Sequence, residues 1–142
     1  MSEMHQLRIL VADDFAEWRA KAHFLLKARP HWQVVGEACN GLQAVQRTAE
    51  LSPDLVLLDI GMPILNGIEA AKQIRSASPG TRIIFLTQDH DPDVKEAALD
   101  SGADQYVLKA NAASELLPAI EAACRLNAAL VPPSTQPDSL LA

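Results

Sequence analysis

The chain has 142 residues, of which 49% are hydrophobic and 21% charged, a composition that fits one globular domain and excludes an intrinsically disordered chain. The formal net charge of -6 argues against nonspecific adhesion to DNA or anionic lipid, and no apolar stretch approaches the ~20 residues needed to span a bilayer. Cys39 and Cys124 show neither disulfide-framework nor zinc-ligand spacing, so we expect buried or half-buried thiols in a cytoplasmic protein without membrane contact.

Short runs rich in Val, Ile and Leu recur along the chain, separated by segments of helix length. Such runs are typical of strands buried on both faces of a parallel sheet. The predicted strands cover residues 7–12, 32–38, 55–58, 83–86 and 106–108.

Helical periodicity falls between these strands. Helices are predicted over residues 16–29, with Pro30 as the stop, 42–51, from Asn66-Gly67 to Ser78, from an Asp91 cap to Gly102, and from a Ser114 cap through Ala123, with Pro118 in its first turn. Five βα units follow from this count. We expect an α/β fold in one domain over residues 1–126 and a Pro-rich linker or tail over 127–142.

Four of the predicted strands end at a polar residue. Asp13-Asp14 follow the first, Asp59 follows the run 55–58, Thr87 follows 83–86, and Lys109 follows 106–108. Because the carboxyl ends of parallel strands lie on one edge, where open α/β sheets bind ligands, these side chains are expected to form one site.

These residues carry a family resemblance. Asp13-Asp14, the segment 53–59 with Met62-Pro63 and Asn66-Gly67, Leu86-Thr87, and the segment 102–109 resemble the receiver domain of two-component response regulators. The match covers about residues 6–126. Gly36-Glu37-Ala38 with Asn40-Gly41, and a Lys109 that no proline follows, are similar to the NarL/LuxR-like branch.

The resemblance implies a flavodoxin-like, doubly wound sheet of five parallel strands in the order 2-1-3-4-5. It also implies a phospho-accepting signalling domain rather than an enzyme, with at most self-catalysed phosphorylation and dephosphorylation. A sensor histidine kinase would be the partner and a homodimer a compatible assembly. DNA would be reached only through an output domain absent from this chain, as in transcriptional regulators of this branch.

Physical reasoning and the resemblance assign the same roles to the site residues. Asp59 would be the phosphoacceptor, because a carboxylate can attack phosphorus, and a hard cation such as Mg²⁺ would offset the repulsion between the two anions. The expected ligands of Mg²⁺ are Asp14, Asp59 and the Gly61 main-chain carbonyl, with Asp13 acting through a water. Lys109 and Thr87 would contact phosphoryl oxygens, and Thr87 and Tyr106 would form the switch.

Each of these residues also has a purely structural explanation. An Asp that closes a strand can be a turn or cap residue, Thr87 can be an ordinary β-branched strand residue, and Tyr106 an edge-strand aromatic. The acidic pair Asp13-Asp14 argues against a flavin phosphate loop, and a haloacid-dehalogenase nucleophile would follow the first strand. A receiver-fold interaction module that works without phosphorylation stays open as the alternative.

Overall fold

The structure is a computed structural model that describes residues 6–130. It contains a five-stranded, all-parallel sheet in the order β2-β1-β3-β4-β5, as expected. The elements are β1 Leu7–Ala12, α1 Ala16–Leu26, β2 Trp32–Ala38, α2 Gly41–Leu51, β3 Leu55–Leu58, α3 Gly67–Ala77, β4 Arg82–Thr87, α4 Pro92–Asp100, β5 Gln105–Leu108, the 3-10 turn η1 Lys109–Asn111 and α5 Ala112–Leu130. The predicted doubly wound α/β fold is confirmed.

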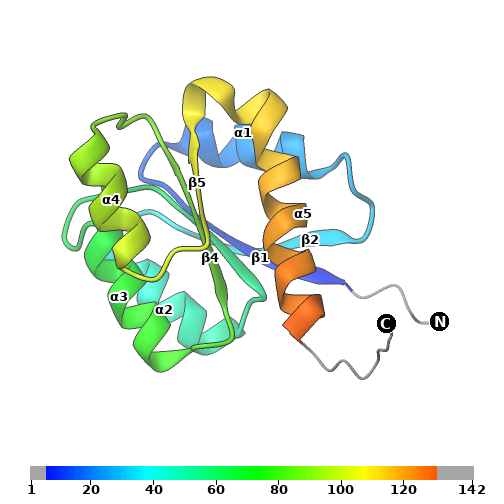
Figure 1. Cartoon of the computed structure of the whole chain (residues 1–142), viewed down its shortest axis with the longest axis horizontal. Coiled ribbons are helices and arrows are strands. Elements are labelled where there is room, and N and C mark those ends of the chain that lie inside the picture. Colours follow the sequence, from blue (N-terminus) through cyan, green and yellow to red (C-terminus); the bar gives the residue numbers. More distant parts are fainter. Residues whose placement is uncertain (1–5, 131–142) are drawn as a thin grey trace.

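Helices cover both faces of the sheet (Figure 1). Alternate residues of each central strand point to opposite faces, so Leu10 packs in the core beneath α2, α3 and α4, whereas Ile9 packs beneath α1 and α5. Leu55, Val56, Leu57 and Leu58 of β3 are each no more than 1% exposed. Burial on both faces explains why the strands read as continuous apolar runs rather than alternating ones.

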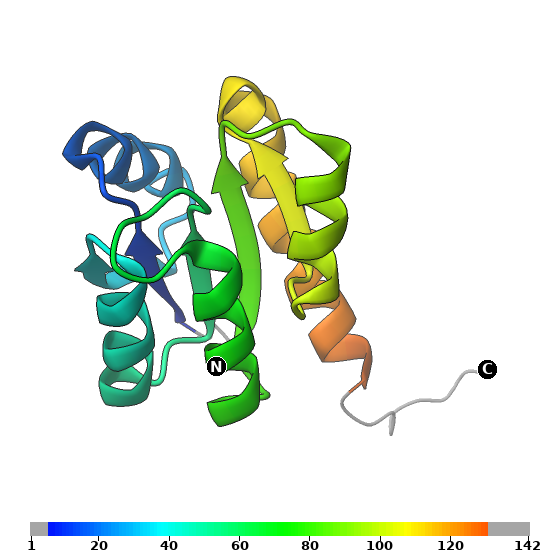
Figure 2. The same cartoon turned by 90° about the vertical axis from the view of Figure 1, so that its left-hand side faces the viewer.

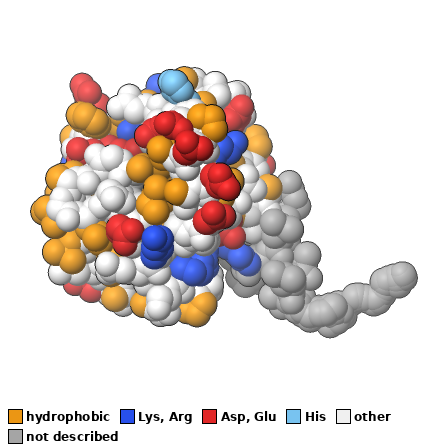
Figure 3. All heavy atoms as spheres, turned by 60° about the vertical axis from the view of Figure 1, so that its left-hand side comes forward, with side chains coloured by type: hydrophobic (Ala, Val, Ile, Leu, Met, Phe, Trp, Pro, Cys, Tyr) orange, Lys and Arg blue, Asp and Glu red, His pale blue; other side chains and the backbone are white. Residues whose placement is uncertain are grey.

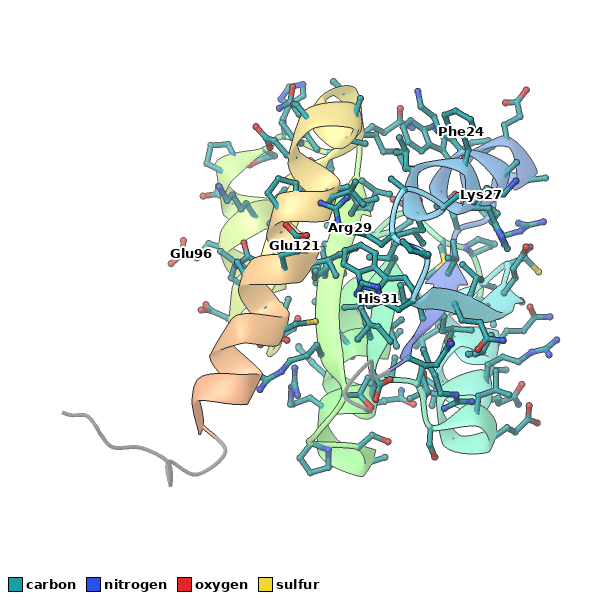
Figure 4. All side chains as sticks on the ribbon, turned by 90° about the vertical axis from the view of Figure 1, so that its right-hand side faces the viewer. Phe24, Lys27, Arg29, His31, Glu96 and Glu121 are labelled. Carbon is teal, nitrogen blue, oxygen red and sulfur yellow. The ribbon has the colours of Figure 1, made fainter. Side chains whose placement is uncertain are left out.

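Helix boundaries differ from the prediction in α1 and α5. Helix α1 ends at Leu26 instead of Arg29, and Arg29 donates from Nε to Glu121 of α5 at 2.9 Å (Figure 4). Helix α5 begins at Ala112, because η1 leads directly into it, so Pro118 lies inside the helix rather than in its first turn. An exposed proline there removes one backbone donor but still permits the helix to continue.

At its carboxyl end, α5 runs to Leu130 and so includes the first residues of the segment expected to be a linker. The remainder of that prediction, residues 131–142, lies outside the described residues. Within the described range no helix is long and apolar enough to cross a membrane.

The two cysteines are free thiols in different environments. Cys124 is half-buried as expected, and burial raises the pKa of its thiol. The expectation for Cys39 was wrong. Cys39 is exposed because it follows the end of β2, an edge strand, at the turn into α2.

Candidate functional site

The carboxyl ends of the strands all lie at one edge, and the arrowheads of β4 and β5 point the same way in Figure 2. Asp13, Asp14 and Asp59 each present a carboxylate oxygen within 4.8 Å of the other two. Asp13 is 4% and Asp59 6% exposed, whereas Asp14 is half-buried. The sheet topology therefore brings together three carboxylates from two strand ends, as predicted.

Lys109 reaches the same place from the end of β5. Its Nζ lies 2.7 Å from Asp13 Oδ2 and 3.6 Å from Asp59 Oδ2, and the residue is 4% exposed. Both contacts are ion pairs between a buried ammonium and a buried carboxylate. The charge of the two carboxylates therefore holds the ammonium next to Asp59.

The donor set fits a hard divalent cation. When all four groups are ionised, three carboxylates and one ammonium leave a net negative charge at this edge. In addition, Asp14 Oδ1 is buried and has no hydrogen-bond partner among the described residues. A buried carboxylate oxygen without a partner is costly unless a cation or water meets it, and Mg²⁺ favours oxygen ligands.

Burial perturbs the titration of Asp59. Desolvation raises the pKa of this carboxyl above its ordinary value, and the neighbouring Asp13 charge adds to the rise. Lys109 and the Thr87 hydroxyl oppose it, since both stabilise the ionised form. The net direction is upward, so the fold holds the ionised Asp59 at a free-energy cost.

A pocket of about 220 Å³ opens beside Asp59. Its lining consists of Phe15, Asp59, Gly61, Thr87, Gln88 and Asp89. Nothing lies within 4 Å of the position that a Cβ on Gly61 would take, so the backbone after Asp59 faces open space. By contrast, a Cβ on Gly67 would lie 2.0 Å from the Asp59 carbonyl oxygen, so only glycine permits α3 to start this close to the strand end.

The loop between Asp59 and α3 is strained at one residue. Ile64 has φ of 71° and is 76% exposed. The left-handed region is unfavourable for a β-branched residue, so the surrounding loop must hold Ile64 there. The loop is closed by backbone bonds from the N–H groups of Met62 and Gly67 to the Ile60 carbonyl, at 2.9 and 2.8 Å.

Thr87 and Tyr106 are linked through the backbone of Asp89, a residue that the sequence analysis did not single out. The Thr87 Oγ1 accepts from the Asp89 N–H at 3.3 Å, and the Tyr106 hydroxyl donates to the Asp89 carbonyl at 2.5 Å. Thr87 is 2% exposed and lines the pocket, whereas Tyr106 lies outside it and lines a cavity of about 450 Å³ on the α4 side. On the face that carries α4, acidic side chains gather next to hydrophobic ones (Figure 3).

The sequence analysis also did not single out two aromatic residues. The rings of Phe15 and Trp18 lie over the Lys109 ammonium. Phe15 follows Asp14 directly and Trp18 is three residues further on, so the signal in the sequence was the presence of two aromatic residues next to the acidic pair.

Comparison with known proteins agrees with this geometry. The family model of the response regulator receiver domain matches residues 9–121. The chain belongs to this family. Among curated proteins, this receiver domain is 39% identical over 119 residues to the transcriptional regulatory protein LiaR of Bacillus subtilis, which covers 84% of this chain and 56% of LiaR. It is 40% identical over 124 residues to the nitrate/nitrite response regulator NarL of Escherichia coli, covering 87% of this chain and 57% of NarL.

Solved structures support the same assignment. The response regulator domain of Thermotoga maritima CheB is 35% identical, with a TM-score of 0.78, and the match covers 84% of this chain and 96% of that domain. The relatives place this receiver domain in the NarL/LuxR-like branch, as expected from its sequence. The chain spans little more than half the length of the curated relatives it matches.

Proposed function

We propose that this receiver domain accepts a phosphoryl group on Asp59 from a sensor histidine kinase, with Mg²⁺ as cofactor, and thereby switches a protein-interaction surface. The observation that carries the proposal is the position of Asp59. Its carboxylate lines the 220 Å³ pocket and also lies 3.6 Å from the Lys109 ammonium. A phosphoryl donor entering the pocket would therefore meet a nucleophile with a cation beside it.

The chain's own residues would divide the chemistry. An Asp59 oxygen forms the new bond to phosphorus as the bond from phosphorus to the donor breaks, and the donor leaves with that electron pair. Lys109 then donates to a phosphoryl oxygen, which requires it to move from Asp13 toward Asp59. The Thr87 hydroxyl, already beside Asp59, donates to another phosphoryl oxygen.

The acidic cluster would hold the metal. Asp14 and Asp59 would bind Mg²⁺ with the Gly61 main-chain carbonyl, and Asp13 through a water; the bound ion offsets the repulsion between the carboxylate and the phosphoryl oxygens. The buried, unpartnered Asp14 Oδ1 supports this assignment. The ion pair between Asp13 and Lys109 supports a less direct role for Asp13.

The switch would use the link through Asp89. If Thr87 moves toward a phosphoryl group, its contact with the Asp89 N–H changes, and the Asp89 carbonyl holds the Tyr106 hydroxyl. The surface around Tyr106 would then respond to phosphorylation by changing its affinity for a partner or a second copy.

In the cell, we propose a cytoplasmic signalling role in a regulator of transcription. The support is the similarity to LiaR, named a transcriptional regulatory protein, and to the response regulator NarL. Any DNA contact would be made by an output domain outside residues 6–130.

The test is covalent modification by acetyl phosphate in the presence of Mg²⁺, followed by intact-mass measurement. The wild-type chain should gain one phosphoryl group and Asp59→Asn none. Asp54→Asn is the matched control, because Asp54 precedes β3 at the opposite end of the sheet and should still permit the adduct. An adduct that persists in Asp59→Asn would overturn the assignment, and a wild type that is never modified would favour the interaction module.

A further inference from the structure

Two aromatic rings lie over the Lys109 ammonium, which also pairs with two carboxylates. Lys109 Nζ lies 5.0 Å from the centroid of the Trp18 ring and 5.7 Å from that of Phe15. Phe15 is the N-cap residue of α1, and the backbone N–H of Trp18 donates to the backbone carbonyl of Phe15 at 3.0 Å. The first turn of α1 therefore directs both rings at the end of β5.

The same turn is anchored to the acidic cluster. The Phe15 N–H donates to Asp13 Oδ1 at 2.9 Å, while the other carboxylate oxygen, Oδ2, pairs with Lys109 at 2.7 Å. Asp13 thus fixes both the start of α1 and the resting position of the ammonium. Trp18 is half-buried and packs against the core beneath α1 and α5, so its ring is held in place from below.

The rings attract the ammonium in a way that carboxylates cannot. A ring face carries partial negative charge but no net charge, so it attracts a cation without strongly directing it. In place of the rings, a carboxylate in contact with Lys109, in addition to Asp13 and Asp59, would hold the ammonium more tightly and oppose its movement toward a phosphoryl oxygen. The ammonium is also shielded from water, since Lys109 is 4% exposed, and this burial strengthens its attraction to an anion on Asp59.

We propose that Trp18, assisted by Phe15, is a positioning residue for phosphoryl transfer: the two rings hold the Lys109 ammonium beside Asp59 while leaving it free to move from Asp13 to the phosphoryl group. The inference rests on the proposed phosphorylation of Asp59. Trp18 contributes more than Phe15, because its ring is closer to the ammonium and Phe15 is 50% exposed.

The experiment measures the initial rate of Asp59 phosphorylation at saturating acetyl phosphate and Mg²⁺. Trp18→Leu should lower this rate about 2- to 30-fold, which corresponds to the ~0.5–2 kcal/mol of a cation–π contact at 1.36 kcal/mol per tenfold. Trp18→Phe restores an aromatic face and should stay within about 3-fold of wild type. Lys21→Gln is the matched control, since it removes the other cation over the same ring, at 5.0 Å, and should leave the rate unchanged.

A double-mutant cycle separates positioning from a structural role. In a Lys109→Met background, Trp18→Leu should change the rate less than about 2-fold, because the ring then has no ammonium to position. An equal loss in both backgrounds would overturn the inference, as would a Trp18→Leu variant that reacts at the wild-type rate. Phe15→Leu, at a half-exposed position, tests the same idea with little risk to folding and should give a smaller loss. If the wild type itself is not modified, the proposed function fails instead.

Discussion

Replacing Lys109 by methionine should strongly destabilise the metal-free protein at pH 7. The side chain is buried, and its ammonium is the cation between Asp13 and Asp59. Methionine is of similar length but leaves both buried carboxylates facing each other without that charge. The fold would have to keep them ionised at a cost or protonate them.

The magnitude follows from the two distances. At an effective dielectric constant of about 20, unit charges 2.7 and 3.6 Å apart attract by about 6 and about 5 kcal/mol, before the cost of desolvating the ammonium. Desolvation offsets much of this attraction, and removing one partner from a buried pair typically costs about 3–5 kcal/mol. We therefore expect the variant to lose about 3–5 kcal/mol of unfolding free energy and to melt roughly 10–20 °C lower.

Mg²⁺ should restore part of that loss. Without the ammonium the cluster carries one more net negative charge, so the variant should bind Mg²⁺ more tightly than the wild type. Urea unfolding with and without millimolar Mg²⁺, at fixed ionic strength, measures both effects. The control is Lys72→Met, because Lys72 forms an exposed ion pair with Glu69 at 3.3 Å and should cost under about 1 kcal/mol with no dependence on Mg²⁺.

Two results would refute this reasoning. If Lys109→Met costs no more than Lys72→Met, the Lys109 ammonium does not balance the carboxylates. If Mg²⁺ stabilises wild type and Lys109→Met equally, the ion does not bind next to that ammonium.

Further outcomes are expected at four other residues. Because burial raises the pKa of Asp59, protonation of this carboxyl favours the folded state at low pH, and this part of the unfolding free energy is lost as pH rises through the folded-state pKa. Asp59→Asn should remove this loss, so the variant should unfold at a higher urea concentration than the wild type at pH 7. Asp14→Ala should lose most of the Mg²⁺ stabilisation, about 2.7 kcal/mol for the wild type at a hundredfold excess over the dissociation constant, in thermal unfolding. Thr87→Ala should still gain a phosphoryl group by mass spectrometry but lose any phosphorylation-dependent dimerisation seen by light scattering. Ile64→Gly should raise the unfolding free energy by about 0.5–1 kcal/mol, because it relieves ~1–2 kcal/mol of backbone strain at a φ of 71°, more than the entropy that glycine loses on folding. A lower melting temperature for the variant would show that Ile64 is not strained.

The sheet edge could be predicted because its signals are local. Each strand shows as a run of apolar residues, and parallel strands necessarily align their carboxyl ends, so the meeting of Asp13, Asp59, Thr87 and Lys109 followed from their places after these runs. The start of α4 was equally predictable, because the Asp91 carboxylate caps it by accepting from the Asp93 N–H at 2.8 Å.

Helix boundaries were harder to predict from the sequence where tertiary contacts determine them. Arginine is a good helix former, so Arg29 was predicted to lie in the helix. Instead α1 ends at Leu26, and Arg29 pairs with Glu121, ninety-two residues away in sequence. The start of α5 depends on the turn that follows β5, because η1 passes directly into the helix ahead of Ser114.

The sequence alone determined which residues would gather at the sheet edge, and only the tertiary structure decided how they pair. Three neighbouring aspartates predict mutual repulsion, but the fold inserts Lys109 closer to Asp13 than to Asp59. Likewise, Trp18 reads as an ordinary apolar position of α1 until β5 brings the ammonium against its ring. The physical reason is range: periodicity and capping act between residues close in sequence, whereas charge pairing and ring contacts depend on distances between elements that meet only once the sheet has formed.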